Sequence, residues 1–297
     1  MRLVSFGVDR IGRLTGPATF VDITEIVAEK PGLPALHPMQ LLIDHWHSLV
    51  DVAASASGRQ YELDEVTLDA PIPRPGMIVA APINYRDHQI EMQQAGDVGH
   101  LGFFLKAPAS VLRPGGQVRL PYHDRRFDQE GEFAVVMGST AKKVPVADAL
   151  SYVFGYTGLL DITMRGGEDR STRKSFDTFT PMGPWIVTAD EIPDPGVLDL
   201  RTFVSGQLRQ KANTRDLIWG VPQLVSYVSS VVTLRPGDII TTGTPAGVGP
   251  LEDGSTIELE ITSIGKLTAT VSSAGATASP TLGAGRGPVP PPPPGAR

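Results

Sequence analysis

The sequence predicts an α+β protein that is mainly β, with a small N-terminal α/β module. Strand-like segments dominate the chain: they are short, rich in β-branched and aromatic residues, and bounded by Gly, Pro and Asp. Helical segments are few, which favours a barrel- or roll-like domain over regularly alternating strands and helices. With 297 residues, of which 41% are hydrophobic, the chain is long enough to bury a full core.

Residues 1–70 are expected to form the small N-terminal module. Short apolar runs alternate with turn residues from Leu3 to Thr24, and this pattern predicts a hairpin. A helical pattern of apolar residues follows from Met39 to Ser55. Three prolines between Asp64 and Pro75 then indicate an exposed linker to the next domain.

The larger domain is predicted to span residues 71–271. Its expected strands share a high content of apolar and β-branched residues: 77–83, 131–138, 152–164, 183–189, 198–206, 238–243 and 255–271. Helical patterns occur at 146–153 and 214–232, and Pro222 indicates a break or a second helix start inside the latter segment.

The C-terminal residues 272–297 differ from the rest in composition. They contain no aromatic or acidic residue and include a proline run from Pro290 to Pro294. Such a segment buries too little apolar area to offset its ordering entropy, so we expect a disordered Pro/Gly/Ala-rich tail. An inert extension is the favoured interpretation, and a polyproline ligand for a partner domain is the alternative.

Composition and charge narrow the classes of function. The formal net charge of -6 argues against a nucleic-acid binder, which needs a basic face. No run approaches the roughly 18 apolar residues of a membrane span, and the first residues lack the apolar run of a signal peptide. The absence of cysteine excludes disulfides and thiol catalysis. We therefore expect a cytoplasmic protein that binds neither membrane nor nucleic acid, with a small anionic molecule as its partner.

Two glutamates in the segment 126–138 are candidate metal ligands. On a strand, Glu130 and Glu132 project from the same face, and Gly131 between them keeps the backbone slim. Adjacent carboxylates repel each other, so a cation between them stabilises the pair, and hard ions such as Mg²⁺ or Mn²⁺ suit oxygen ligands. A solvated acidic strand face is the alternative interpretation.

Asp161 is a candidate third carboxylate, because it ends an apolar strand and is followed by Arg165. Alone, such an aspartate is more often a helix cap. Together with Glu130 and Glu132 it would form a three-carboxylate metal site with open positions for water and a chelating substrate.

The segment 84–91 offers a candidate general base. In a helical turn His88 and Glu91 lie on one face, and a carboxylate that orients an imidazole makes it a competent base. An ordinary surface helix is the alternative. The glycine-rich stretch that follows would allow the segment to move as a lid.

Candidate substrate-binding groups lie further along the chain. Arg165 and Lys174 are basic residues placed to neutralise a carboxylate or an enolate. The glycine-rich turn 241–249 is not a phosphate loop, because no Gly-Lys-Ser/Thr follows, but it would present Thr244 and backbone amides to an anionic group.

Seven segments, taken in order, resemble the fumarylacetoacetate hydrolase superfamily, in particular its acylpyruvase and 2-hydroxyhepta-2,4-diene-1,7-dioate isomerase-like branch. They are NYRDHQIE, GFFLKAPAS, DQEGEFAVVMG, YVFGYTGLLDITMR, RKSFDTFTPMGPWIVTADEI, GQLRQKANTRDLI and LRPGDIITTGTPAGVG. The similarity extends from about Met77 to Val271. It implies a mixed β-roll catalytic domain, a homodimer, and Mg²⁺, Mn²⁺ or sometimes Ca²⁺ as the cofactor.

The resemblance also implies roles for individual residues. Metal ligation is expected at Glu130, Glu132 and Asp161, and catalysis at His88, Glu91 and Lys174. The expected substrate-binding residues are Tyr85, Arg165, Glu168 and Thr244. Two departures affect the pocket: Glu168 stands where a neutral amide is common, and the usual glycine before Asn-Tyr is replaced.

The implied activity is hydrolysis of a carbon–carbon bond in an acylpyruvate or 1,3-diketo acid, in the catabolism of an aromatic or related compound. His88 would activate water, and Lys174 with Arg165 would stabilise the developing negative charge. Decarboxylation of a 2-oxo acid, hydration of a 2-oxo-enoate and keto–enol isomerisation are alternatives, since all pass through an enolate. A non-catalytic ligand-binding relative, with the tail as its recognition element, is the alternative of another class.

Overall fold

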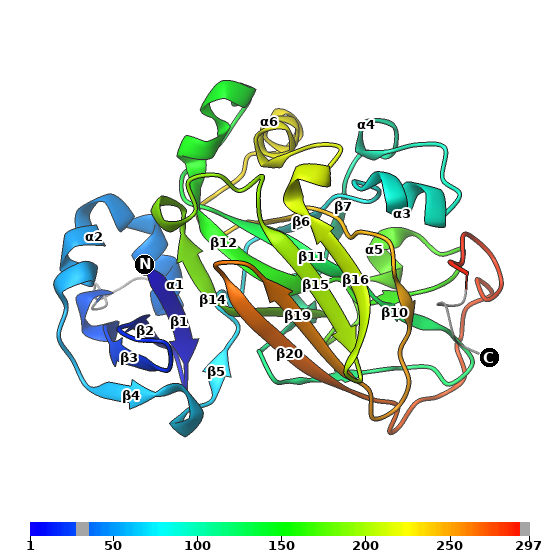
Figure 1. Ribbon diagram of the computed structural model, residues 1–297, viewed down its shortest axis with the longest axis horizontal. Helices are drawn as coiled ribbons and strands as arrows, with labels where there is room; N and C mark the ends of the chain where they lie inside the picture. Colours follow the sequence, from blue (N-terminus) through cyan, green and yellow to red (C-terminus); the bar gives the residue numbers. More distant parts are fainter. Residues whose placement is uncertain (28–35, 292–297) are drawn as a thin grey trace.

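The computed structural model describes residues 1–27 and 36–291, and strands make up most of its regular structure (Figure 1). The strands form a twelve-stranded sheet, a five-stranded sheet and a three-stranded sheet. The prediction of an α+β fold that is mainly β is therefore confirmed. None of the helices in the described ranges has the length and apolar character needed to cross a bilayer.

The N-terminal module is an antiparallel meander with two helices beside it. Its strands are β1 (Arg2–Phe6), β2 (Arg10–Leu14), β3 (Thr19–Asp22), β4 (Gln60–Glu62) and β5 (Leu68–Asp69), and its helices are α1 (Pro38–Asp44) and α2 (Trp46–Ser55). The prediction of a single helix from Met39 to Ser55 is wrong, because the structure has two helices there. His45 leaves the helical conformation (φ -112°, ψ 17°) and separates α1 from α2.

The central sheet runs from the module into the larger domain. After β1 its strands follow in the order β14 (Thr180–Thr188), β12 (Val153–Leu160), β11 (Gly131–Met137), β17 (Ile239–Thr241), β6 (Ile78–Ala80) and β7 (Phe104–Lys106). A short strand, β8 (Val111–Leu112), pairs with β14. Every residue of β11 and β12 is buried, which explains why these strands are continuous apolar runs in the sequence.

The five-stranded sheet packs on the central sheet with one face exposed to solvent. Its order is β16 (Gln207–Asn213), β15 (Asp199–Val204), β19 (Thr256–Ile261), β20 (Gly265–Ser272) and β9 (Gln117–Arg119). Buried and more exposed residues alternate along β15 and β19, as expected for a sheet with one face on the core. Leu200, Leu259 and Leu267 join the core that also holds Tyr156 of β12.

The remaining strands and α-helices lie beside the two large sheets. They are β10 (Phe127–Gln129), β13 (Thr163–Met164), β18 (Gly249–Pro250), α3 (Arg86–Glu91), α4 (Val98–Leu101), α5 (Arg170–Arg173) and α6 (Val221–Val231). Helix α6 begins at Val221 with Pro222 in its first turn, which agrees with the predicted second helix start. Figure 1 shows α3 and α5 at the end of the molecule opposite the N-terminal module.

The C-terminal extension differs from the predicted disordered tail up to Pro291; residues 292–297 lie outside the described part. The backbone N–H of Thr277 donates to Pro121, that of Gly167 donates to Gly283, and the Arg126 side chain donates to the carbonyl oxygen of Pro290. The extension therefore runs along the end of the molecule that carries α5 (Figure 1). The prediction of disorder is based on the small apolar area that this composition can bury. The contacts of the extension with the rest of the protein are hydrogen bonds, which composition does not predict.

Gly131 allows the two large sheets to approach each other closely. A Cβ atom at this position would lie 2.1 Å from the Thr202 hydroxyl of β15 and 3.1 Å from Leu259 of β19. Both neighbours belong to buried residues, so a side chain here requires the second sheet to shift.

We expect Gly131→Ala to lower the free energy of unfolding by about 1–3 kcal/mol, the usual cost of overpacking a core. Urea denaturation of both proteins measures this loss. Gly196→Ala is the matched control, because among the described residues beyond its chain neighbours the Asp194 side chain alone lies within 4 Å of its added Cβ. Equal stability of Gly131→Ala and the unchanged protein would contradict the close approach.

Candidate active site

Three acidic residues from two strands meet at one end of the central sheet. Glu130 directly precedes β11, Glu132 lies on it, and Asp161 directly follows β12. The antiparallel register pairs Gly131 with Leu160, and the Asp161 N–H donates to the Glu130 carbonyl oxygen at 2.8 Å. Ligand oxygens of the three carboxylates lie within 4.8 Å of one another, and all three residues are buried. The structure thus brings together the three residues predicted as metal ligands.

Two of these carboxylates have cationic partners. Arg165 donates to Glu130 at 2.8 Å, and Lys174 donates to Glu130 at 2.6 Å and also to Asp161. Burial opposes ionisation of Glu130, but the charges of Lys174 and Arg165 outweigh it and hold its pKa below the ordinary value. Asp161 also accepts from Lys106 Nζ at 2.5 Å.

Glu132 has no such partner among the described residues. Its Oε2 accepts from the Thr241 hydroxyl and, at 2.8 Å, from the Gly243 N–H, while Oε1 accepts no hydrogen bond there. Burial, and then the charge of Asp161, raise the pKa of Glu132 to about 8. An added cation would stabilise the ionised form of such a buried carboxylate without a cationic partner.

The donor set fits a divalent metal. Three carboxylates supply only oxygen, which Mg²⁺ and Mn²⁺ prefer, and Glu132 Oε1 is left without a protein partner. Glu130, Glu132 and Asp161 are the residues that would hold the ion. The ion would add the positive charge that Glu132 lacks.

His88 and Glu91 form the predicted pair on α3. His88 Nδ1 lies 2.9 Å from Glu91 Oε2, and the histidine side chain is 4% exposed. The other oxygen of Glu91 accepts from the Gly247 N–H at 2.9 Å. Glu91 therefore orients the imidazole and is itself held by the glycine-rich turn that also binds Glu132 through Gly243.

A small cavity connects these groups. Its lining includes one acid, one histidine and four cations, together with apolar and amide side chains: Glu130, His88, Arg165, Arg170, Arg173, Lys174, Pro82, Ile83, Met92, Gln94, Phe104 and Pro288. Its volume is about 40 Å³, room for only a few water molecules and well below the range usual for small-molecule sites. Glu132 and Asp161 are more deeply buried than Glu130, behind the Lys174 ammonium group that joins Glu130 to Asp161.

Lys106 is a buried cation at the site for which the sequence suggested no role. Its side chain is fully buried, and its ammonium donates to Asp161 and to the carbonyl oxygens of Lys174 (2.7 Å) and Phe179 (3.1 Å). Burial lowers its pKa, and the charge of Asp161 partly offsets this. A lysine within the apolar segment 103–107 was the available signal, because an isolated charge in a buried strand needs a partner.

Three of the predicted substrate-binding residues are not among those that line the cavity. Thr244 uses its hydroxyl within the fold, accepting from Gln210 at 2.6 Å and donating to the Gly131 carbonyl oxygen at 3.0 Å. Tyr85 is 1% exposed, and its buried hydroxyl has no described hydrogen-bond partner. Arg165, the fourth, does line the cavity.

Glu168 is engaged with the C-terminal extension instead of the cavity. Arg125 donates to both of its carboxylate oxygens at 2.8 Å, and the Thr281 hydroxyl also donates to it. Hydrogen bonding to Arg125 lowers the pKa of Glu168 to about 2. The acid that departs from the family pattern therefore anchors residues 279–281 beside the site.

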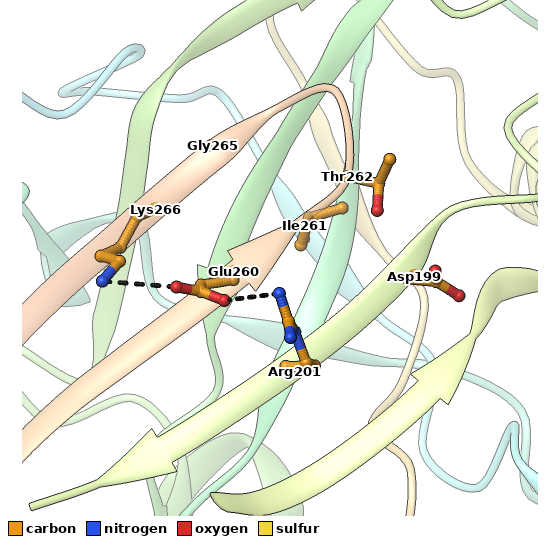
Figure 2. Close-up of a pocket in the computed structure, with 7 residues that line it drawn as sticks. All are labelled: Asp199, Arg201, Glu260, Ile261, Thr262, Gly265 and Lys266. Carbon is orange, nitrogen blue, oxygen red and sulfur yellow. Dashed lines mark ion pairs between the residues drawn. The ribbon is translucent and has the colours of Figure 1, made fainter. Parts of the chain in front are cut away.

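A second hollow lies on the solvent face of the five-stranded sheet (Figure 2). Its charged side chains neutralise each other: Glu260 forms ion pairs with Arg201 at 3.0 Å and with Lys266 at 3.3 Å. No buried acid or base is left without a partner there among the described residues, so this hollow lacks the features of a catalytic site.

The chain belongs to the fumarylacetoacetate (FAA) hydrolase family, whose C-terminal domain model matches residues 77–272. It is 40% identical over 288 residues to a maleylpyruvate hydrolase of Aquipseudomonas alcaligenes, covering 92% of this chain and 100% of that protein. The fold and the class of enzyme predicted from the sequence, a metal-dependent hydrolase of this family, are thereby confirmed.

Two solved structures support the same classification. The maleylpyruvate hydrolase of Sphingobium sp. SYK-6, in complex with manganese(II) and pyruvate, has a TM-score of 0.83 and 39% identity, covering 92% of this chain and 99% of that one. A 2-hydroxyhepta-2,4-diene-1,7-dioate isomerase from Mycobacterium marinum has a TM-score of 0.74 and 34% identity, covering 93% and 99%.

The raised pKa of Glu132 predicts that metal binding releases a proton. Below about pH 8 the metal-free protein holds a proton on this carboxyl, which the ion must displace. The apparent affinity for Mn²⁺ should therefore rise about tenfold per pH unit up to about pH 8 and level off above it.

Calorimetric titration at pH 7 in two buffers of different ionisation enthalpy measures this release, which we expect to approach one proton per ion. Asp199→Asn, in the surface hollow, should leave the release unchanged. Binding of Mn²⁺ at pH 7 without proton release would contradict the proposed state of Glu132.

Proposed function

We propose that this chain hydrolyses the carbon–carbon bond of an acylpyruvate, a 2,4-dioxo acid, to pyruvate and a carboxylate. The observation that carries the proposal is that His88, which is hydrogen-bonded to Glu91, and the Glu130 carboxylate line one cavity. An oriented base and a metal-ligating acid that share a cavity suit the activation of water beside a chelated substrate. The similarity to two maleylpyruvate hydrolases supports this substrate class.

When bound, the divalent ion held by Glu130, Glu132 and Asp161 supplies Lewis acidity to the dicarbonyl oxygens. His88 donates through Nδ1 to Glu91, which leaves Nε2 free to take a proton from water. The water oxygen bonds to the distal carbonyl carbon, the carbon–carbon bond breaks, and its electron pair goes to the methylene carbon. His88 returns its proton to that carbon, and the acid product leaves as a carboxylate with its proton released to solvent.

Lys174 and Arg165 stabilise negative charge on the pyruvate half in this scheme. Both are buried and both line the cavity. Burial alone would lower their pKa values, but the carboxylates around them raise both, so each stays charged in the cavity. A fixed buried cation stabilises a developing enolate more strongly than water does.

We infer that Mg²⁺ or Mn²⁺ is the physiological ion, because the ligand set is three carboxylates; Ca²⁺, which also binds oxygen ligands, is the alternative. A homodimer and a cytoplasmic location remain predictions from the sequence. The three proposed metal ligands and Lys174 all come from residues 126–174 of one chain.

Isomerisation of a keto–enol substrate is a second candidate function, favoured by the similarity to the isomerase from M. marinum. The two reactions differ in product, since only hydrolysis releases pyruvate from an acylpyruvate. Incubation of the Mn²⁺-loaded protein with an acylpyruvate, oxaloacetate or a 2-hydroxydienoate separates hydrolysis, decarboxylation and isomerisation.

We expect Glu132→Gln to abolish pyruvate release from an acylpyruvate and to remove the rise in melting temperature that Mn²⁺ causes. The substitution removes one of three ligands and the negative charge that the ion neutralises. Pyruvate release and thermal denaturation with and without Mn²⁺ measure both effects. Glu258→Gln, on the exposed face of β19, is the control and should retain both properties. Full Mn²⁺ stabilisation of Glu132→Gln would overturn the metal site.

We expect His88→Gln to lower kcat by about 10²- to 10⁴-fold, the usual contribution of a general base, while the Mn²⁺-dependent rise in melting temperature is kept. Glu91→Gln should lower kcat less, because the imidazole remains but loses its orienting charge. Steady-state kinetics on an acylpyruvate provide the measurement. A His88→Gln variant with normal kcat would show that another group activates water.

A further inference from the structure

The cavity carries more positive charge than its acids neutralise. Arg165 donates to Asp128 at 2.6 Å and to Glu130, while Lys174 donates to Glu130 and Asp161. The other two cations of the lining, Arg170 and Arg173, form no ion pair with any residue in the ranges 1–27 and 36–291. These two arginines are not needed for the three-carboxylate site.

The Arg173 side chain is held by hydrogen bonds to backbone carbonyl groups and has no acidic partner among the described residues. It is 8% exposed, its Nε donates to the Glu168 carbonyl oxygen at 2.8 Å, and its Nη1 donates to that of Met164 at 3.3 Å. Its Nη2 has no hydrogen-bond partner in the described part of the chain. A guanidinium stays charged even when buried, so its unneutralised charge is costly unless an anion binds.

Arg170 adds a second guanidinium on the same face of α5. The two arginines are three residues apart, which places their side chains next to each other on a helical turn. Arg170 is partly exposed, lines the same cavity, and has no side-chain hydrogen bond to the described residues. Two adjacent guanidinium groups match the two oxygens of a carboxylate.

We propose that Arg173, together with Arg170, binds a second carboxylate of the substrate, at the end of its acyl group. The proposal rests on the proposed function and narrows it: the substrate is a dicarboxylate whose pyruvate half is held by Lys174 and Arg165. Arg173 and Arg170 are then specificity-determining residues that select an acid-terminated acyl chain. Arg165 and Lys174, the other cations of the lining, are already paired with acids, so Arg170 and Arg173 are left for that group.

Paired substrates test the proposal. Maleylpyruvate carries a carboxylate on its acyl group, whereas acetylpyruvate ends in a methyl group. For Arg173→Met we expect kcat/KM for maleylpyruvate to fall by about 30- to 100-fold, the usual value of charge-assisted hydrogen bonds, mainly through KM. The fall for acetylpyruvate should be at least tenfold smaller. Equal falls for both substrates would show that Arg173 binds the pyruvate carboxylate or supports the fold, and would overturn the proposal.

Two further variants protect the test against a folding defect. Arg170→Met removes a partly exposed side chain without breaking any described hydrogen bond, and it should shift the ratio of the two substrates in the same direction. Arg173→Lys keeps the charge and should restore part of the preference for maleylpyruvate. Arg113→Met is the control, because this exposed arginine donates only to the neighbouring Pro114 carbonyl oxygen. A ratio unchanged in both Arg170→Met and Arg173→Met would contradict the proposal.

Binding of the acid product separates this proposal from the proposed function. Maleate and isocrotonate differ by one carboxylate, and calorimetry measures their affinity for the Mn²⁺-loaded protein without turnover. We expect maleate to bind at least tenfold more tightly, with the difference lost in Arg173→Met. If this holds but neither acylpyruvate is hydrolysed, the proposed reaction fails and the carboxylate site stands. If both are hydrolysed and maleate shows no preference, the carboxylate site fails and the reaction stands.

Discussion

Burial of several carboxylates at one end of the central sheet is the electrostatic constraint on which the rest of this structure depends. The buried side chains of Lys106, Arg165 and Lys174 form ion pairs with Glu130 and Asp161. Glu132 accepts hydrogen bonds but has no cationic partner in the described part of the chain, so its pKa is raised and an added cation would stabilise its ionised form. Removing one member of a buried ion pair would leave the other member as an uncompensated buried charge, which is strongly destabilising. Each buried acid therefore needs a cation, although the cations come from distant segments of the chain.

The glycine-rich turn 241–249 contacts both the buried acids and the His88–Glu91 pair. Gly243 donates to Glu132, and Gly247 donates to Glu91, which in turn orients His88. Gly243 and Gly247 adopt positive φ, and an added Cβ at Gly247 would lie 1.9 Å from the Arg209 carbonyl oxygen. One turn therefore positions both Glu132, a proposed metal ligand, and Glu91, the hydrogen-bond partner of His88.

The cavity holds more arginine than the three-carboxylate site and the His–Glu pair require. In the proposed reaction the three-carboxylate site and the His–Glu pair need only Lys174 and Arg165 as cations. Arg170 and Arg173 are therefore proposed to bind the part of the substrate beyond the reacting carbons. The C-terminal extension completes the same wall through Pro288, and the Arg125–Glu168 ion pair anchors it.

The sequence by itself determined most of the strands, the Glu130 and Glu132 pair as candidate ligands and the His88–Glu91 pair, because period, apolar runs and i, i+3 spacing are local properties. Thr244, Tyr85 and Glu168 were expected in the pocket, but their partners come from segments far along the chain, and local patterns carry no information about those partners. The same reason applies to Lys106 and to the extension, whose order depends on polar contacts with residues about 120 to 160 positions away. Only the tertiary structure decided which charged side chains form pairs. A charged group needs a partner once it is buried, and burial arises only when distant segments pack together.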